Sequence, residues 1–160
     1  MEKIFSLKKL LSTLKTLRKK KRVVFTNGCF DIIHAGHVRY LEKAKALGDV
    51  LVVGLNSDSS IKKIKGETRP IVKQKDRGEV LSALASVDYV IIFNDPTPIK
   101  LIEKIKPDIL VKGADWERGS IVGIDVLKTY GGRVARIKLA KGRSTTDIVG
   151  KILKIHKKVI

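Results

Sequence analysis

Cysteine, aromatic residues and long apolar runs are scarce in this chain of 160 residues. Cys29 is the single cysteine, so the chain can form neither an internal disulfide nor a zinc centre made of cysteines. Aromatic residues make up 5% of the sequence, which is poor provision for stacking exposed bases. The sequence has no apolar run as long as a membrane span and no secretory signal at its start. We therefore expect a cytoplasmic protein that neither inserts stably into a membrane nor binds nucleic acid.

Positive charge is the strongest feature that is present. The 34 Lys and Arg residues outnumber the 16 Asp and Glu residues and give a formal net charge of +18. Such a balance fits nucleic acid, an anionic membrane surface or small phosphorylated substrates, and charge alone does not choose among them. The length suits one domain, and a sequence that is 43% hydrophobic and 31% charged is typical of globular proteins.

The first segment of the chain has the pattern of a basic amphipathic helix. Residues 6–20 carry leucines at helical spacing, with lysines on the opposite side. We therefore divide the chain into an N-terminal helical extension, residues 1–20, and a main domain, residues 21–160. A helix of this kind can lie on a membrane, but we favour packing on its own domain or on a partner subunit. The leucine face also predicts a homodimer or a higher homo-oligomer.

Short apolar runs and amphipathic segments alternate along the rest of the chain. The predicted strands are 22–26, 49–55, 88–93, 107–113 and 133–139. The predicted helices are 37–48, 58–64, 75–86, a segment from Asp95 toward Lys104, 123–130 and a closing helix after Ser144. This alternation predicts an α/β fold, a Rossmann-like three-layer α/β/α arrangement with a five-stranded parallel sheet. Ligands of such sheets bind beyond the carboxyl ends of the strands, so the candidate site is sought there.

The first predicted strand leads into TNGCFDIIHAGH, residues 26–37. Asn27 and Gly28 allow a tight turn that brings backbone close to a ligand. Gly36 precedes His37 where a helix begins, and the unpaired N–H groups of a helix N-terminus attract phosphate. His34 lies three residues before His37, so both imidazoles face one side of this opening and can donate to phosphate oxygens. The P-loop and dinucleotide-binding glycine patterns are both absent from the sequence.

Seven of these residues carry a resemblance to a known family. The pattern N-G-x-F-D-x-x-H-x-G-H is formed by Asn27, Gly28, Phe30, Asp31, His34, Gly36 and His37. It resembles the signature of the HxGH nucleotidyltransferases, the cytidylyltransferase-like superfamily. The segments that agree in order are Lys65-Gly66, Arg69-Pro70, Arg77, Val111 to Trp116 and Ser144 to Thr146. The resemblance covers roughly residues 20–155, and NSDSS, KIKGETRPI and LVKGADW are most similar to the adenylyltransferase domain of ADP-heptose synthase.

The resemblance implies an activity and a set of site residues. The family's enzyme couples D-glycero-β-D-manno-heptose 1-phosphate to ATP, which yields ADP-heptose for the lipopolysaccharide inner core and releases pyrophosphate. No kinase domain precedes this sequence, so we expect the stand-alone form. The implied catalytic residues are His34, His37 and Lys65. The implied nucleotide-binding residues are Thr26, Asn27, Gly28, Phe30, Asp31, Gly36, Arg77, Gly113, Asp115, Trp116, Ser144, Thr145 and Thr146.

The residues suggest how such a site would work. The histidines would donate to phosphates, Lys65 would neutralise phosphate charge, and Arg77 would reach the triphosphate from its helix. Asp115 and Trp116 would line the nucleoside pocket with Gly113. The hydroxyls of residues 144–146 would hold β- and γ-phosphate oxygens, and Asp31 would orient the loop. Mg²⁺ is expected to be held mainly by phosphates and water, without a dedicated set of protein ligands.

Two alternative functions remain open. A glycerol-3-phosphate cytidylyltransferase has R-T-x-G-I-S-T-T where this chain has LAKGRSTT, residues 139–146, and Leu139 stands in place of the arginine. This difference favours the heptose group over the use of CTP. The second alternative, from another class, is a non-catalytic module that binds nucleotide or RNA through its basic surface. The preference for ATP over CTP rests on the resemblance and not on residue spacing.

Overall fold

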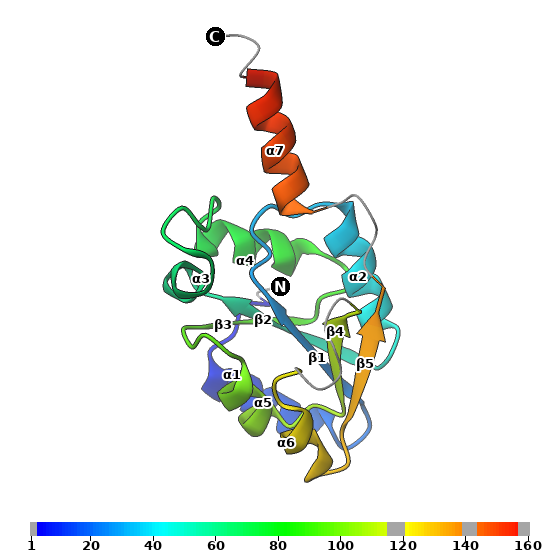
Figure 1. Ribbon diagram of the computed structural model, residues 1–160. Coiled ribbons are helices and arrows are strands. Elements are labelled where there is room, and N and C mark those ends of the chain that lie inside the picture. The colour runs from blue at the N-terminus through cyan, green and yellow to red at the C-terminus, as the bar shows by residue number, and fades with distance from the viewer. Residues whose placement is uncertain (1–2, 115–120, 139–143, 157–160) are drawn as a thin grey trace.

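A five-stranded sheet, parallel throughout, lies at the centre of the computed structural model, which describes residues 3–114, 121–138 and 144–156. The strands are β1 (Val23–Gly28), β2 (Val50–Asn56), β3 (Tyr89–Phe93), β4 (Ile109–Gly113) and β5 (Arg133–Ile137). Their spatial order is β3-β2-β1-β4-β5, with β1 in the middle (Figure 1). The predicted α/β fold with a five-stranded parallel sheet is therefore confirmed.

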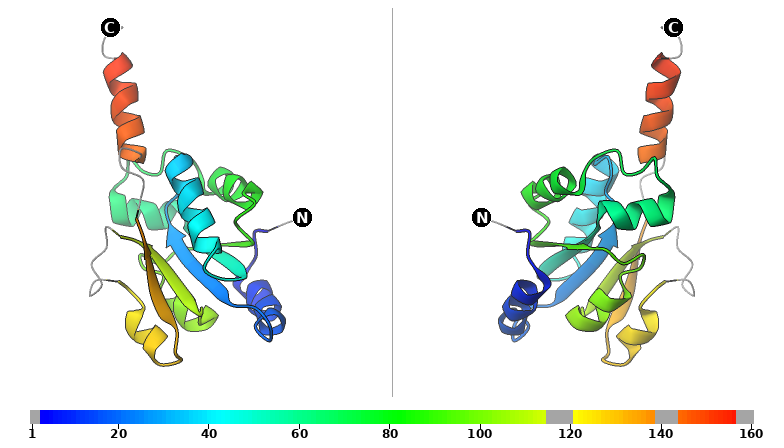
Figure 2. Two further views of the ribbon diagram at one scale, coloured as in Figure 1. Left: turned by 90° about the vertical axis from the view of Figure 1, so that its right-hand side faces the viewer. Right: turned by 90° about the vertical axis from the view of Figure 1, so that its left-hand side faces the viewer.

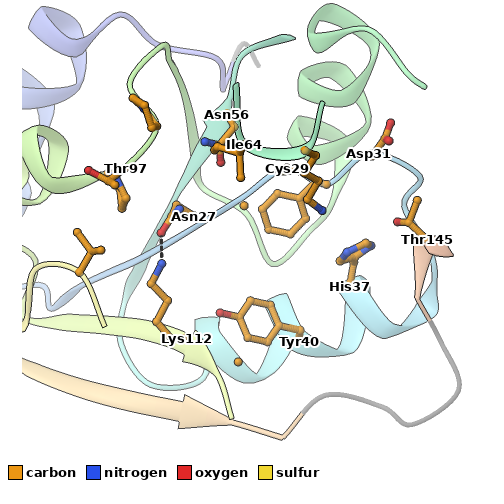
Figure 3. Close-up of a pocket in the computed structure, with 17 residues that line it drawn as sticks. Asn27, Cys29, Asp31, His37, Tyr40, Asn56, Ile64, Thr97, Lys112 and Thr145 are labelled. Atoms are coloured by element: carbon orange, nitrogen blue, oxygen red, sulfur yellow. Dashed lines mark hydrogen bonds between the residues drawn. The ribbon is translucent and has the colours of Figure 1, made fainter. Parts of the chain in front are cut away.

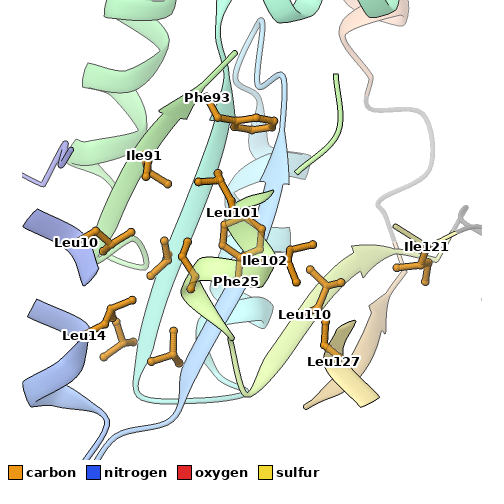
Figure 4. Close-up of a cluster of buried hydrophobic side chains, with 14 residues drawn as sticks. Leu10, Leu14, Phe25, Ile91, Phe93, Leu101, Ile102, Leu110, Ile121 and Leu127 are labelled. Carbon is orange, nitrogen blue, oxygen red and sulfur yellow. The ribbon is translucent and has the colours of Figure 1, made fainter. Parts of the chain in front are cut away.

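Helices cover both faces of this sheet. They are α1 (Leu7–Leu17), α2 (Ala35–Lys45), α3 (Asp58–Lys65), α4 (Gln74–Ala83), α5 (Ile99–Ile105), α6 (Ile124–Lys128) and α7 (Thr145–His156). One buried apolar cluster joins α1, α5 and α6 to the sheet (Figure 4), and a second joins α2 and α4 to the opposite face. The side views in Figure 2 show helices on either side of the strands. The predicted three-layer arrangement is confirmed.

Strand β2 shows why this sequence folds as a covered parallel sheet. All seven of its residues, VLVVGLN, are buried, so the strand is apolar nearly throughout instead of alternating. Gly54 is needed here because a Cβ at this position would lie 2.8 Å from the ring of Phe25. The ring of Phe25 therefore lies over Gly54 on one face of the sheet, in space that a side chain at residue 54 would otherwise occupy.

The N-terminal segment packs as part of the domain. Leu10 and Leu14 of α1 are 0% and 1% exposed and lie in the same cluster as Phe25 of β1. Before the helix, Ile4 forms a parallel bridge with Val90 on the edge strand β3. The division into an extension, 1–20, and a domain, 21–160, stays a prediction. Leu10 and Leu14 thus pack on the helix's own domain, which is one of the two expected arrangements.

Helix α7 differs from the other long helices because it projects away from the body of the domain (Figures 1 and 2). None of its side chains is buried, and Ile152, Leu153 and Ile155 are 48%, 56% and 53% exposed. Among the described residues, no helix is both long and apolar enough to cross a bilayer. The predicted closing helix is present, and its first residues lie close to the carboxyl ends of the strands.

The sheet changes direction between β1 and β4, and this change places the candidate site. From β1 the chain builds outward to β2 and β3, and then crosses back to add β4 and β5 on the other side. Strands β1 and β4 pair only at Val24–Ile109 and Phe25–Leu110, so their carboxyl ends diverge. Crevices at such reversals bind ligands in open α/β sheets.

Candidate active site

A cavity of about 370 Å³ lies at the diverging carboxyl ends of β1 and β4 (Figure 3). Its walls come from the loop between β1 and α2, the end of α3, the loop before α5, the end of β4 and the first residue of α7. The predicted site residues that line it are Asn27, Gly28, Phe30, Asp31, His37, Lys65, Gly113 and Thr145. This volume falls in the usual range for small-molecule sites, about 300–1,000 Å³. The topology therefore brings together segments from the whole length of the chain.

His34 and His37 form a stacked pair at the start of α2. Their ring centroids are 3.9 Å apart, with an angle of 24° between the planes. His34 is the N-cap residue, and its Nδ1 accepts a hydrogen bond from the backbone N–H of Gly36 over 3.1 Å. When the ring is neutral, its proton therefore lies on Nε2. The helix begins at Ala35, two residues before the predicted start. The reason is that an imidazole acts as the N-cap here, a role usually filled by Ser, Thr, Asp or Asn.

His37 carries a buried polar atom without a partner. Its Nδ1 is inaccessible to solvent and has no hydrogen-bond partner among the described residues. Burial, together with the nearby charges of His34 and Lys65, lowers the pKa of His37 from 6.5 to about 4. The ring is therefore neutral at pH 7 in the free protein. The ring faces the cavity beside Thr145 (Figure 3), so an anion bound there would favour its protonation.

The turn before the histidines is held in an unusual conformation. Phe30 has φ of 44°, in the left-handed region that an aromatic residue seldom adopts. Its ring packs against Gly28, where a Cβ would lie 3.0 Å from the ring, and lies 5.3 Å from the ring of His37. Strained backbone of this kind is characteristic of functional sites. Gly28 and Phe30 thus shape the wall next to the histidine pair.

Asp31 fastens the segment that follows α3. Its Oδ1 accepts from the backbone N–H groups of Ile71 and Val72, and its Oδ2 accepts from Arg69 over 3.0 Å. Burial by itself would raise the pKa of Asp31, but these three hydrogen bonds outweigh it and lower the pKa. The expected orienting role of Asp31 agrees with this geometry. The fastened segment follows Lys65, which is exposed and lines the cavity.

Arg77 is placed differently from the expectation that it reaches the triphosphate. Its side chain is completely buried and does not line the cavity. Its acceptors, reached over 2.5–2.9 Å, are the carbonyl oxygens of Cys29, Asn56 and Val72 and the carboxylate of Asp58. Arg77 therefore ties the ends of β1 and β2 to the start of α3. We correct its assignment from a phosphate contact to a structural support.

Thr26 and Gly36 are buried and lie outside the cavity lining. The hydroxyl of Thr26 hydrogen-bonds with that of Tyr40 over 2.8 Å and donates to the Val111 carbonyl over 3.1 Å. It therefore joins β1 to α2 and β4 where backbone pairing between the strands has ended. These two residues support the site from behind and do not face the cavity.

Lys112 and Tyr40 line the cavity but were not among the predicted site residues. Lys112 is 8% exposed, and its Nζ donates to Oδ1 of Asn27 over 2.5 Å. Burial lowers the pKa of Lys112 to about 8. The available signal was a lysine next to the end of a strand at the sheet reversal, because the candidate site was sought beyond the carboxyl ends of the strands.

The residues at the start of α7 separate into two groups. Thr145 lines the cavity, whereas Ser144 and Thr146 do not. The Ser144 hydroxyl caps the helix by accepting from the N–H of Asp147 over 3.0 Å, and Oδ2 of Asp147 accepts from the N–H of Ser144 over 3.1 Å. This reciprocal pair is a capping box. Ser144 therefore orients α7 so that its N-terminus opens beside the cavity. Asp115 and Trp116 lie outside the described residues.

The described residues provide no clustered cage for a metal ion. Groups of three or more His, Cys, Asp or Glu side chains that could hold a cation are absent from this part of the chain. The cavity is lined by imidazole, ammonium, hydroxyl and amide groups and by the carboxylate of Asp31, whose oxygens already accept from Arg69 and two backbone N–H groups. Such donors match the oxygen atoms of phosphorylated ligands.

Comparisons with known proteins agree with this architecture. The bifunctional protein HldE of Geobacter metallireducens is 54% identical over 136 residues, which are 85% of this chain and 28% of that protein. HldE of Helicobacter pylori is 54% identical over 154 residues, 96% of this chain and 32% of that protein. The chain thus spans less than a third of the length of these curated relatives.

Solved structures show the same fold. The crystal structure of the lipopolysaccharide core biosynthesis protein from Thermoplasma volcanium is 31% identical, with a TM-score of 0.62, and covers 77% of this chain and 99% of that one. Pantoate-beta-alanine ligase from Francisella tularensis has a TM-score of 0.65 at 17% identity over 98% of this chain and 80% of that one, a likeness of fold alone. The sequence profile described as Cytidylyltransferase-like matches residues 25–151. By that match over most of its length, the chain belongs to the cytidylyltransferase-like family.

Proposed function

We propose that this chain is an adenylyltransferase that transfers the AMP group of ATP to D-glycero-β-D-manno-heptose 1-phosphate. The products are ADP-heptose, a precursor of the lipopolysaccharide inner core, and pyrophosphate. The observation that carries the proposal is the stacked pair His34 and His37 at the start of α2, beside a cavity at the sheet reversal. The 54% identity to HldE proteins supports the choice of this reaction within the family.

The reaction needs positioning more than proton transfer. An oxygen of the sugar phosphate forms a bond to the α-phosphorus of ATP, and the bond from that phosphorus to the bridging oxygen breaks. Pyrophosphate leaves with the electron pair of that bond. Because the attacking oxygen is already anionic, the step requires no strong general base. The protein therefore has to bring two anions together and stabilise the charge that builds on the phosphates.

The described side chains can supply that stabilisation. His34 and His37 would donate to phosphate oxygens in front of the positive end of α2, and Lys65 would approach from the end of α3. Thr145 would add a hydroxyl from the start of α7. His37, neutral in the free protein, becomes easier to protonate when a polyanion lies beside it. Two positively charged rings therefore do not lie side by side before the substrate binds, because His37 is neutral until then.

Magnesium would bind with the phosphates and would neutralise part of their charge. Mg²⁺ commonly keeps several water molecules and takes phosphate oxygens as ligands, so few protein ligands are needed. Consumption of ATP fits a cytoplasmic location. The expected homo-oligomer stays a prediction, which the mass of the purified chain in light scattering would test.

The test is a substrate panel. The purified chain is incubated with Mg²⁺, each of the four nucleoside triphosphates and a set of acceptors that includes heptose 1-phosphate and glycerol 3-phosphate, and pyrophosphate is measured. We expect release only with ATP and heptose 1-phosphate. Release with CTP and glycerol 3-phosphate would replace this proposal with the cytidylyltransferase alternative. No release, together with salt-sensitive RNA binding, would favour the non-catalytic module.

A further inference from the structure

Lys112 occupies an unusual place for its residue type. Among the residues that the structure describes, it is the one lysine classed as buried. It extends from the end of β4 into the cavity, and Figure 3 shows it at the opposite end from His37 and Thr145. Burying an ammonium group is unfavourable, so its position in a cavity wall needs a reason other than stability.

The surroundings of Lys112 orient its ammonium group toward a ligand. Nζ donates to Oδ1 of Asn27, the last residue but one of the neighbouring strand β1. This bond helps to fix the direction of the ammonium group. Although burial lowers the pKa of Lys112 to about 8, the group is mostly protonated at neutral pH. A positive charge therefore lies at this end of the cavity.

The geometry of the reaction says which anion belongs there. In an in-line displacement, the attacking oxygen and the leaving oxygen lie on opposite sides of the α-phosphorus. The helix start with His37, together with Thr145, forms the end suited to the pyrophosphate portion. The attacking phosphate then has to approach from the other end, where Lys112 and Asn27 lie.

We propose that Lys112, oriented by Asn27, binds the phosphate group of the acceptor sugar and holds its oxygen for attack on the α-phosphorus. This inference rests on the proposed adenylyltransferase function and adds a phosphate subsite to it. One acceptor oxygen bonds to phosphorus, the bridging bond to pyrophosphate breaks, and Lys112 keeps its protons throughout. The subsite selects acceptors by their phosphate group.

The experiment separates the two substrates. Lys112→Met keeps the length of the side chain and removes its charge, and Lys128→Met on α6, where the lysine is 70% exposed, is the matched control. With ATP and heptose 1-phosphate varied in turn, we expect Lys112→Met to raise KM for the sugar phosphate by about 10- to 100-fold and to change KM for ATP by less than about 2-fold. Lys112→Arg should restore part of the loss, and Lys128→Met should behave as wild type. An equal or larger rise in KM for ATP, or an unchanged KM for the sugar phosphate, overturns the proposal.

A binding measurement distinguishes failure of this subsite from failure of the proposed function. If the wild-type chain does not turn over heptose 1-phosphate, the proposed function fails, and titration calorimetry with glucose 1-phosphate in the presence of α,β-methylene-ATP tests Lys112 on its own. Binding by wild type that is lost in Lys112→Met supports the subsite, whereas equal binding, or none by wild type, contradicts it. If Lys112→Met does not fold, as judged by circular dichroism, Lys112→Gln replaces it in both measurements.

Discussion

Arg77 and His37 lie on either side of the loop that leaves β1, and their surroundings are opposite. The guanidinium of Arg77 is enclosed, and its N–H groups are taken up by three carbonyls and the carboxylate of Asp58. The Nδ1 of His37 is equally hidden from solvent but has no partner among the described residues. Buried polar groups are nearly always paired, so the unpaired Nδ1 marks His37 as a residue whose place packing alone does not explain. The comparison separates a residue that holds the site together from one that we propose contacts the substrate.

The largest effect is expected when Arg77 is replaced. Arg77→Met would remove the cation that pairs with Asp58, and the part-buried carbonyl of Cys29 and the buried carbonyl of Asn56 would each lose a hydrogen bond. Removing one partner of such a buried network costs about 3–5 kcal/mol of unfolding free energy. Urea denaturation followed by circular dichroism measures the loss, and Arg39→Met, at an exposed position of α2, is the control. A variant as stable as wild type but with weak ATP binding would return Arg77 to the phosphate site.

His37→Ala should behave in the reverse manner. Loss of one donor that stabilises developing charge lowers kcat by about 100- to 1,000-fold, while the urea midpoint changes little. Pyrophosphate release gives the rate, and circular dichroism checks the fold. The control is His156→Ala, because His156 is exposed on α7. Normal turnover by a folded His37→Ala protein would remove the histidine pair from the mechanism.

The pH dependence of stability sharpens the same contrast. The pKa of His37 falls from 6.5 to about 4 on folding, chiefly through burial. Between these values the unfolded chain binds more protons, so the stability linked to the neutral ring is fully present above pH 6.5 and is lost as the pH falls toward 4. Wild type should therefore lose more stability than His37→Gln between pH 7.5 and pH 4.5 in urea titrations. Parallel losses in both proteins would mean that the ring is not held neutral.

The smallest effect is expected at the start of α7, where two adjacent threonines differ in position. Thr145 lines the cavity, whereas Thr146 is exposed. Removing one hydroxyl donor to phosphate should lower kcat/KM by up to about 10-fold in Thr145→Val. Thr146→Val should match wild type in the same pyrophosphate assay. Equal losses of kcat/KM in the two variants would show that the loss comes from a change at the start of α7, and not from removal of a hydroxyl that faces the cavity.

The fold could be predicted from the sequence because its signals are local. The buried run of β2 and the alternation of strands with helices determine a covered parallel sheet without knowledge of any contact. The amphipathic pattern of α1 was equally clear, but the pattern shows only that an apolar face exists and not what covers it. Leu10 and Leu14 therefore turned out to pack within the domain, while the apolar residues of α7 remain half exposed.

Site residues could be predicted from the sequence where their type and spacing indicate their chemistry. They could not be predicted where tertiary packing determines the direction in which a side chain points. The histidine pair follows from sequence spacing and the helix start. Arg77 lies on a helix at a position whose side chain points inward, which only the approach of α4 to the strand ends determines. All residues of the strand that contains Lys112 are buried. The sequence therefore shows no alternation of polar and apolar residues that would indicate the direction of the Lys112 side chain.

The bridge between Ile4 and Val90 has a consequence for the behaviour of the protein at high concentration. Strand β3 is outermost in the sheet, and its Val90 exchanges backbone hydrogen bonds with Lys3 and Phe5. The opposite margin, β5, presents the exposed guanidinium groups of Arg133 and Arg136. Open sheet margins invite strands from other molecules, so one margin is shielded by the chain's own beginning and the other by electrostatic repulsion. None of the first five residues lines the cavity, so their removal would leave its lining complete but would uncover a template for aggregation.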